Sequence, residues 1–323
     1  MNPRQILVVG GSGFIGSHVV AQLASQGLKV IVPTRHRERA RHLLLLPRVD
    51  VVETHVSEPG VLEHLARGCD TAISLVGILH GRAAGPDWGP DFDRAHVQLP
   101  RLLVKACAAQ GVRRLVHISA LGVTEGGERS LPSRYLRSKA AGEAVIRTAP
   151  DLDWTVLRPS VVFGADDAFM NVFARLQALL PLIGLAGSTA RFQPVWVGDV
   201  AAATVNVLDD PHTHGKVYPL VGPEVFTLRQ LVELAGVWTG HSKPIIGLPA
   251  GIDRLVAMLM ELAPGEPMMS RDNIDSMSID NVSDAAVAPE LGITPVSLRE
   301  LGPSMYGGGI ATRFSRLRER AGR

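Results

Sequence analysis

The fold is decided by one stretch near the N-terminus, Gly10-Gly11-Ser12-Gly13-Phe14-Ile15-Gly16. It follows the apolar run Ile6–Val9, which has the length of a buried strand, and it opens the segment Phe14–Gln26, whose apolar residues recur with a helical period. Glycines at this spacing permit a tight turn and a close approach to a pyrophosphate, and the helix N-terminus offers free N–H groups to phosphate oxygens. Glycines also mark ordinary turns, but strand, turn and helix in this order predict a dinucleotide-binding loop.

Strand-like and helical segments alternate through the first half of the chain. We expect strands at Ile6–Val9, Val30–Pro33, Asp50–Val52, Thr71–Leu75, Arg114–Ser119 and Trp154–Arg158. The helices Phe14–Gln26 and Arg101–Gln110 are each followed by a glycine, which favours a helix end. Because parallel strands are joined by right-handed crossovers, helices should cover both faces of the sheet. The predicted fold class is α/β, with a Rossmann-type doubly wound parallel sheet.

This alternation breaks down after Gly164. We expect residues 1–164 to form the dinucleotide-binding core and residues 192–222 to return to it. Residues 165–191 and 223–323 are predicted to form a smaller, interleaved C-terminal substrate lobe. The first of these two segments is rich in leucine and poor in charge, as in an apolar lid. It favours an apolar substrate, such as a quinone-like or isoprenoid compound, over a nucleotide sugar.

The composition excludes several classes of protein. Of the 323 residues, 46% are hydrophobic and 20% are charged, which excludes a disordered chain and a coiled coil. No apolar run approaches the ~18 residues that would predict a membrane span. Cys69 and Cys107 lie far apart and lack Cys-x-x-Cys spacing, so we expect neither a disulfide framework nor a metal site. The chain enters its first strand without an export signal, and we expect a cytoplasmic location.

The net charge of +2 is unevenly distributed. The last stretch has a local charge of +4, because one carboxylate, Glu319, stands among Arg313, Arg316, Arg318, Arg320 and Arg323. That leaves −2 for the rest of the chain, which does not support a nucleic-acid partner. The basic tail is predicted to be a solvated helix end, with contact to an anionic membrane or a partner surface as the alternative.

The residues after the second strand bear on the choice of cofactor. An acidic residue there accepts a hydrogen bond from the ribose 2′-hydroxyl of NAD(H), whereas a basic one pairs with the 2′-phosphate of NADP(H). The sequence at this place is Thr34-Arg35-His36-Arg37, and the nearest carboxylate is Glu38. Arg35 suits a bidentate contact to phosphate, although it could also be an ordinary surface arginine. NADP(H) is therefore favoured, and NAD(H) remains possible.

A second motif, Tyr135-Leu136-Arg137-Ser138-Lys139, has the spacing Tyr-x-x-x-Lys at the start of a predicted helix. Spacing of four residues places the phenol and the ammonium on one helix face. A phenol has an ordinary pKa near 10, and a neighbouring cation favours its phenolate. We therefore expect Tyr135 to act as general acid and base, and Lys139 to lower the phenol pKa and hold the nicotinamide ribose.

Together with Leu157-Arg158-Pro159-Ser160 and Gln193–Val200, these motifs resemble the extended or atypical short-chain dehydrogenases/reductases. A closer resemblance is to bacterial relatives of the NADPH-binding accessory subunit of respiratory complex I. It rests on the Gln-Pro-Val segment at residue 193 and on Leu75–Leu79, Tyr135–Glu143 and Phe163–Asn171. The similarity covers about Ile6 to Val221.

This resemblance implies roles for individual residues. The pyrophosphate loop would be formed by the stretch Gly10–Gly16, with Gly10, Gly13 and Gly16 as its glycines. Arg35 would bind the 2′-phosphate, and Val76 and Gly77 would form the wall beside the cofactor. Tyr135 and Lys139 would be the catalytic pair.

Two positions depart from the family pattern. Where these families often carry an Asp against the adenine, this chain has Thr54-His55-Val56. The hydroxyl that polarises the substrate carbonyl in active extended enzymes is expected where Ala120 stands, and Ser119 comes one position early. Ser119 is retained as a catalytic candidate.

Three functions fit these observations. The leading one is an NADP-dependent oxidoreductase of the short-chain type, in which hydride passes between the nicotinamide and a carbonyl or alcohol carbon. The second is a non-catalytic NADPH-binding protein with an accessory, assembly or redox-sensing role, because an enzyme without one oxyanion donor could lose ~10²-fold in rate and still bind cofactor. The third is a sugar-nucleotide epimerase or dehydratase. The resemblance further implies contact with a respiratory complex or the inner membrane face. The substrate and the oligomeric state are left open.

Overall fold

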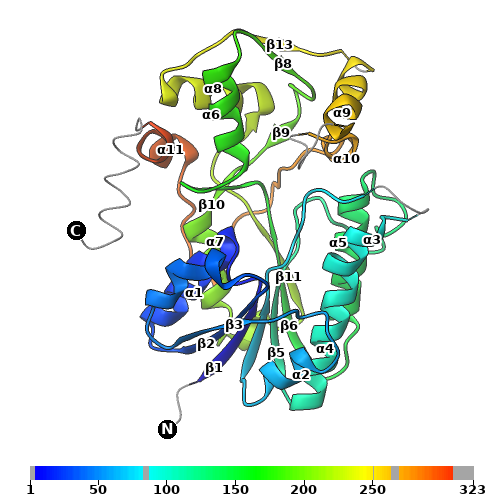
Figure 1. Cartoon of the computed structure of the whole chain (residues 1–323), viewed down its shortest axis with the longest axis vertical. Coiled ribbons are helices and arrows are strands. Elements are labelled where there is room, and N and C mark those ends of the chain that lie inside the picture. Colours follow the sequence, from blue (N-terminus) through cyan, green and yellow to red (C-terminus); the bar gives the residue numbers. More distant parts are fainter. Residues whose placement is uncertain (1–3, 83–86, 250, 263–268, 308–323) are drawn as a thin grey trace. The chain divides into compact units, whose positions relative to one another are not determined.

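The structure is a computed structural model that describes residues 4–82, 87–249, 251–262 and 269–307 (Figure 1). The chain divides into two compact units. Unit 1 comprises the residues up to Pro159, Val197–Leu220 and Ser283–Thr294. Unit 2 comprises Ser160–Trp196, Val221–Val282 and the residues from Pro295 onward.

Unit 1 contains a seven-stranded sheet with the order β11-β6-β5-β4-β1-β2-β3, in which every pair of neighbours is parallel. Its strands are β1 (Gln5–Val9), β2 (Lys29–Thr34), β3 (Val49–Glu53), β4 (Thr71–Ser74), β5 (Arg114–Ile118), β6 (Asp153–Pro159) and β11 (Lys216–Leu220). The predicted Rossmann-type fold class is confirmed. The strand order reverses between β1 and β4, and ligands of such sheets bind at the carboxyl ends of the strands at this point.

Helices cover both faces of this sheet (Figure 1). On one face, α1 (Phe14–Ser25) packs against α7 (Val197–Asn206). On the other, α4 (Leu99–Gln110) packs against α2 (Val61–Ala66) and α5 (Arg134–Arg147). Shorter helical turns are η1 (Arg37–Leu45), α3 (Pro90–Phe92), η2 (Asp93–Gln98), η3 (Pro211–Thr213) and η4 (Pro289–Leu291).

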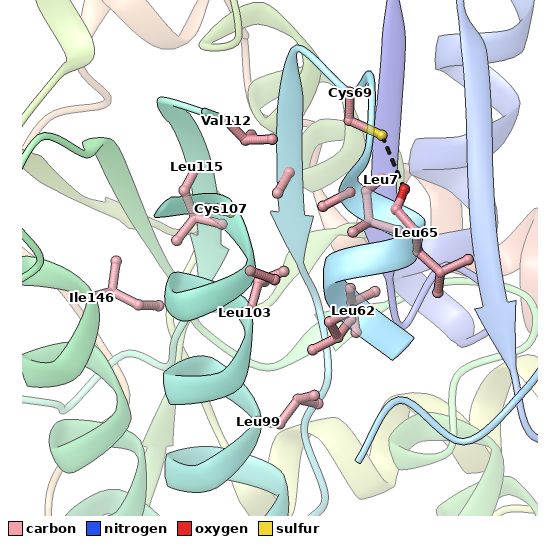
Figure 2. Packing of buried hydrophobic residues seen from close by; sticks show 14 residues of the cluster. Leu7, Leu62, Leu65, Cys69, Leu99, Leu103, Cys107, Val112, Leu115 and Ile146 are labelled. Carbon is pink, nitrogen blue, oxygen red and sulfur yellow. Dashed lines mark hydrogen bonds between the residues drawn. The ribbon is translucent and has the colours of Figure 1, made fainter. Parts of the chain in front are cut away.

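A leucine-rich core joins α2 and α4 to the sheet (Figure 2). Leu7 and Leu115 from the strands meet Leu62 and Leu103 from the helices, and all four side chains are at most 1% exposed. Burial of each contributes about 1.5–3 kcal/mol to folding. Cys69 lies at the rim of this cluster. Both cysteines are buried and free, and the Cys69 thiol donates to the carbonyl oxygen of Leu65 at 3.3 Å.

Unit 2 is built from three two-stranded sheets and five helices among its described residues. The strand pairs are β7 (Val162–Phe163) with β10 (Val195–Trp196), β8 (Ile183–Leu185) with β13 (Ile245–Gly247), and β9 (Arg191–Phe192) with β12 (Phe226–Thr227). The helices are α6 (Phe169–Leu179), α8 (Leu228–Thr239), α9 (Ile252–Leu262), α10 (Arg271–Ser276) and α11 (Leu298–Tyr306). The segment expected to be an apolar lid therefore contains a regular helix, α6, and the strand β8.

The compact units differ from the expected division mainly at residues 283–294, which cluster with unit 1, and by up to five residues at the other boundaries. The reason is a tertiary contact, because the amide nitrogen of Asn206 in α7 donates to the carbonyl oxygens of Leu291 and Gly292. The arginines of the basic tail, Arg313 to Arg323, lie outside the described residues. Among the described helices, none is long and apolar enough to cross a membrane.

Candidate dinucleotide-binding and catalytic site

The glycine turn connects β1 to α1 in the middle of the sheet. Gly10 has a φ of +89°, a left-handed conformation that favours glycine, and a Cβ there would lie 2.9 Å from the backbone nitrogen of Val76. A Cβ on Gly16 would lie 2.2 Å from the carbonyl oxygen of Gly10, and one on Gly11 would lie 3.0 Å from the Val32 side chain. Packing within unit 1 therefore requires glycine at positions 10 and 16 and leaves little room at position 11.

Gly13 differs from these glycines. It is exposed, and among the described residues a Cβ there would meet only the carbonyl oxygen of Gly10, at 3.3 Å. Gly13 is also the N-cap of α1, where no side chain caps the helix and the first turn has no acidic residue. Phe14 and Ile15 begin this helix. Gly13 thus keeps a space open beside uncapped N–H groups, as a pyrophosphate requires.

Arg35 follows β2 directly and is exposed. The strand end before it is tied to the glycine turn, because the Ser12 hydroxyl donates to Oγ1 of Thr34 at 3.4 Å. The nearest carboxylate, Glu38, pairs with Arg41 instead. Within the described residues Arg35 has no ion pair, so its guanidinium is available to an anion at the carboxyl end of β2.

The end of β3 carries His55, which is exposed where an Asp is expected from the family pattern. A cavity of about 350 Å³ lies between this strand end and α2, and it is lined by Val52, Thr54, Pro59, Gly60, Val61, His64 and Leu65. The lining contains no carboxylate. An adenine bound near this strand end would therefore be held mainly by apolar contacts.

The candidate catalytic pair lies in the first turns of α5. Ser133 caps this helix, because its hydroxyl accepts a hydrogen bond from the N–H of Leu136 at 3.1 Å. Tyr135 is partly buried, and Lys139, one turn later, is 3% exposed. The ammonium of Lys139 donates to the carbonyl oxygen of Ile118 at 2.8 Å, at the end of β5. The pair is thus anchored at the carboxyl edge of the sheet.

The loop after β4 links this pair to the glycine turn. Its residue Val76 touches Gly10, as described above, and a Cβ on Gly77 would lie 4.0 Å from Nζ of Lys139. Gly77 itself is exposed. The structure therefore brings Gly10 next to Val76, and Gly77 next to Lys139.

Burial sets the protonation of the two groups. It lowers the pKa of Lys139 to about 8, although the charge of Glu143 raises it, and it raises the pKa of Tyr135 to about 12. Burial is the cause of the shift at Tyr135, and the expected lowering of its phenol pKa by Lys139 stays a prediction. With a pKa of about 12, the phenol is protonated at neutral pH and can donate a proton.

A buried ion pair lies one turn beyond Lys139. Nε of Arg158 in β6 donates to the carboxylate of Glu143 at 3.1 Å, and its terminal nitrogen contacts the other carboxylate oxygen. Glu143 is 2% exposed. Arg158 is therefore held in an ion pair with Glu143.

Ala120 occupies the position where the family pattern leads us to expect a hydroxyl. Ala120 packs with Leu136 and Ala140 in a small apolar cluster, against which Tyr135 also lies. Ser119 is 4% exposed, and its hydroxyl is buried without a hydrogen-bond partner among the described residues. The hydroxyl of Ser119 is therefore buried, one residue before the expected place.

Sequence reasoning missed two residues of this region, Glu143 and His96. Both are buried polar side chains on helices, where isolated charge or imidazole groups need partners. The partner of Glu143 is on another element, and the sequence does not reveal which one. For His96, a signal was present in Pro100, four residues later, because proline disturbs a helix at the residue four positions before it.

Comparisons with known proteins agree with the fold. The chain matches the family described as NAD(P)H-binding over residues 10–211. It is 30% identical over 303 residues to the mouse mitochondrial protein "NADH dehydrogenase [ubiquinone] 1 alpha subcomplex subunit 9", which covers 90% of this chain and 76% of that one. It is also 30% identical over 200 residues to a ceramide reductase from Caulobacter vibrioides, covering 62% and 59% of the two chains.

A third relative is 4-hydroxy-2-methyl-3-oxo-4-farnesyl-3,4-dihydroquinoline-1-oxide ketoreductase from Stigmatella aurantiaca, 26% identical over 277 residues and 79% of each chain. Among solved structures, UDP-glucuronic acid 4-epimerase from Bacillus cereus has a TM-score of 0.69 at 21% identity, covering 94% of this chain and 98% of that one. This structural likeness supports the fold.

The fold and the glycine turn define an NAD(P)H-binding Rossmann protein. The chain belongs to the NAD(P)H-binding family, and within it to the atypical extended short-chain dehydrogenases/reductases related to the complex I subunit. The residues present fit a dinucleotide, because Gly13 leaves the required space at the uncapped N-terminus of α1.

Proposed function

We propose that this protein is an NADPH-dependent reductase that acts on a carbonyl group of an apolar substrate. The observation that carries the proposal is the place of Tyr135 and Lys139. Both lie on α5 at the carboxyl edge of the sheet, and the ammonium lies beside Gly77, in the loop that also touches the glycine turn. Tyr135, as a proton donor, would therefore lie near the loop that contains Gly77, where we expect the nicotinamide end of a dinucleotide.

The direction of the reaction follows from the pKa of the phenol. When bound, a reduced nicotinamide supplies a hydride to the carbonyl carbon. Tyr135 gives its phenolic proton to the carbonyl oxygen, so that the product is an alcohol and the phenolate is reprotonated from solvent. Because burial raises the pKa of Tyr135 to about 12, the phenol is protonated at neutral pH and suits reduction better than alcohol oxidation. Lys139 would hold the ribose hydroxyls and stabilise the transient phenolate.

The proposed preference for NADPH rests on Arg35. Its guanidinium has no ion pair within the described residues and stands at the end of β2, where a 2′-phosphate would be bound. Glu38 does not compete for the ribose 2′-hydroxyl, because it pairs with Arg41.

The proposed substrate class rests on unit 2. Leu179, Leu180 and Leu182 at the end of α6 are 79%, 42% and 44% exposed, and Ile246 in the neighbouring β13 is 53% exposed. Exposed apolar residues grouped in this way favour an apolar ligand or surface. The names of two relatives, a ceramide reductase and a ketoreductase of a farnesyl-substituted compound, support the same class.

Helix α9 of unit 2 carries further exposed apolar residues. Two of its charged residues pair with α10, Arg254 with Asp275 at 2.7 Å and Glu261 with Arg271 at 3.0 Å. Four of its apolar residues are exposed, Ile252, Leu255, Met258 and Leu259, whereas Ala257 is buried. The helix thus presents the face that amphipathic helices usually bury.

The partner proposed for this surface is an anionic lipid bilayer that holds the substrate. Residues 168–190 and 234–252 contain Arg175, His241 and Lys243 but no aspartate or glutamate, and in α9 Glu261 is paired with Arg271. Exposed apolar side chains with basic groups nearby suit the interface of an anionic membrane. Flotation with vesicles of phosphatidylcholine, with and without phosphatidylglycerol, tests this. We expect binding only to the anionic vesicles and its loss in Leu255→Ser/Leu259→Ser, and equal flotation of this variant would contradict the proposal.

A second candidate function is a non-catalytic NADPH-binding protein. It is favoured by Ala120, which places a methyl group where active extended enzymes carry a hydroxyl, and by the relation to the complex I subunit. The two candidates differ in turnover. The test is to incubate the purified full chain with NADPH and 2-decanone or decanal and to follow both NADPH consumption and alcohol formation. Stoichiometric alcohol formation supports the reductase, and cofactor binding without product supports the binding protein.

A further inference from the structure

His96 is a buried imidazole with a partner on each ring nitrogen. It lies in the turn η2 and is 2% exposed. The backbone N–H of Ile78, in the loop after β4, donates to Nε2 at 3.0 Å. Nδ1 lies 2.8 Å from the hydroxyl oxygen of Ser138 in α5. The imidazole therefore bridges the loop on the cofactor side and the helix that carries Tyr135 and Lys139.

The direction of each hydrogen bond in this bridge is fixed by chemistry. A backbone amide only donates, so Nε2 of His96 must accept and carries no proton. The proton of the neutral ring is then on Nδ1 and is donated to the Ser138 hydroxyl, which in turn donates to the carbonyl oxygen of Tyr135 at 2.8 Å. In a protonated imidazole, Nε2 would also carry a hydrogen, and this N–H would point at the N–H of Ile78. Burial and the charges of Lys139 and His117 hold the pKa of His96 well below its ordinary value.

The backbone of His96 is held in place by two neighbouring residues. Pro100 has no N–H to give to the carbonyl oxygen of His96, four residues earlier, and the chain widens into a π-helical turn over residues 93–98. Gly142 allows α5 to approach this oxygen directly, because a Cβ on Gly142 would lie 1.8 Å from it. The backbone of His96 therefore packs directly against α5, and this packing restricts the position of the imidazole.

The ring also contacts the candidate catalytic groups. Its centroid lies 5.6 Å from that of the Tyr135 ring in an edge-to-face arrangement of 79°. Phe92 stacks on it at 5.4 Å. A Cβ on Gly77 would lie 3.9 Å from Nε2 of His96 and 4.0 Å from Nζ of Lys139. The imidazole therefore fills the space between the Tyr135 ring, the Lys139 ammonium and the cofactor-side loop.

We propose that His96 is a positioning residue for the candidate catalytic pair, which acts by tying the N–H of Ile78 to the hydroxyl of Ser138 and by supporting the Tyr135 ring. The proposal rests on the proposed reductase function for its kinetic consequence, whereas the bridge itself exists with or without turnover. A phenol that is displaced by about 1 Å transfers its proton far less efficiently, while cofactor and substrate contacts elsewhere are unchanged.

The kinetic test compares three variants of the full chain, with 2-decanone as the probe. His96→Leu removes both hydrogen bonds. His96→Gln keeps an amide oxygen that reaches the position of Nε2 and accepts from Ile78. His212→Leu, at an exposed imidazole of unit 1, is the matched control. We expect His96→Leu to lower kcat about tenfold or more with KM changed less than twofold, and His96→Gln to recover most of kcat. Wild-type kcat in His96→Leu, or a His96→Gln variant as slow as His96→Leu, would overturn the positioning role.

The spectroscopic test does not depend on turnover. In the ¹⁵N-labelled wild-type chain, the ring nitrogens of His96 are assigned by their loss in His96→Gln. We expect a proton on Nδ1, none on Nε2, and no titration between about pH 5.5 and 8. A proton on Nε2, or titration near the ordinary histidine pKa, would overturn the bridge. Absence of wild-type turnover together with the expected spectrum would refute the reductase function and leave the bridge standing.

Discussion

Arg158 holds the buried carboxylate of Glu143 one helical turn beyond Lys139, and so joins β6 to the helix of the candidate catalytic pair. Removing the guanidinium would leave a buried carboxylate that, among the described residues, is compensated by Arg147 at 4.0 Å and by the charge of Lys139. Arg158→Met should therefore lower the free energy of unfolding by about 3 kcal/mol.

This prediction is checked by urea denaturation. The double variant Glu143→Gln/Arg158→Met removes both charges and should recover part of the loss. Arg113→Met, at an exposed ion pair with Asp153, is the control and should change stability by less than about 1 kcal/mol. If Arg158→Met is as stable as the control, the ion pair does not stabilise the fold.

The glycines of the turn should respond differently to substitution. Gly16→Ala places a Cβ 2.2 Å from the carbonyl oxygen of Gly10, so the variant should be strongly destabilised. Gly13→Val should fold, because position 13 is exposed, but its side chain would occupy the place of the pyrophosphate. Thermal unfolding with and without NADPH distinguishes the two effects. A Gly13→Val variant that NADPH stabilises as fully as the wild type would show that the loop is only a turn.

Cofactor choice should depend on Arg35. Arg35→Asp removes the proposed phosphate contact and adds a carboxylate that can accept from a 2′-hydroxyl. We expect NADPH binding to weaken about tenfold or more, at least ~1.4 kcal/mol, and NADH binding to stay the same or improve. Calorimetric titration with both dinucleotides measures this. Equal losses for both would refute the assignment, and Arg37→Asp on the same loop is the matched control.

Buried Lys139 should make stability depend on pH. Its pKa is about 8 in the folded state and near 10.5 in the unfolded state, so between these values the unfolded chain binds more protons. The free energy of unfolding therefore gains up to about 3 kcal/mol from this group as pH rises from about 8 to 10.5, and none of this gain is present below pH 8. Lys139→Met should lack this rise and should be more stable than the wild type at pH 7. A constant difference between the two proteins across this pH range would contradict the assigned burial.

The sequence predicted the parts of the molecule that depend on local signals. The glycine stretch and the apolar runs placed six strands of the parallel sheet to within one residue at each end, because strands buried on both faces read as short apolar runs bounded by turns. The four-residue spacing of Tyr135 and Lys139 predicted that both lie on one face of a helix, and both are on α5.

Properties that depend on tertiary contacts were beyond the sequence. The phenol of Tyr135 is buried by groups from other elements, so its raised pKa could not be inferred from Lys139 alone. Residues 283–294 join unit 1 through Asn206, which is far away in the sequence. The bridge made by His96 requires that α5 lies close to the loop that follows β4. No local sequence pattern predicts this contact.

The most direct test of the account is the effect of Tyr135→Phe on carbonyl reduction and on NADPH affinity, measured in the same preparation. The substitution removes the phenolic proton and little volume, whereas we expect cofactor affinity to depend on the glycine turn, Arg35 and Lys139. We expect NADPH-dependent reduction of 2-decanone to fall ~10²-fold or more while the Kd for NADPH changes less than twofold. Wild-type reduction that survives Tyr135→Phe would contradict the assigned role of Tyr135 and with it the proposed mechanism.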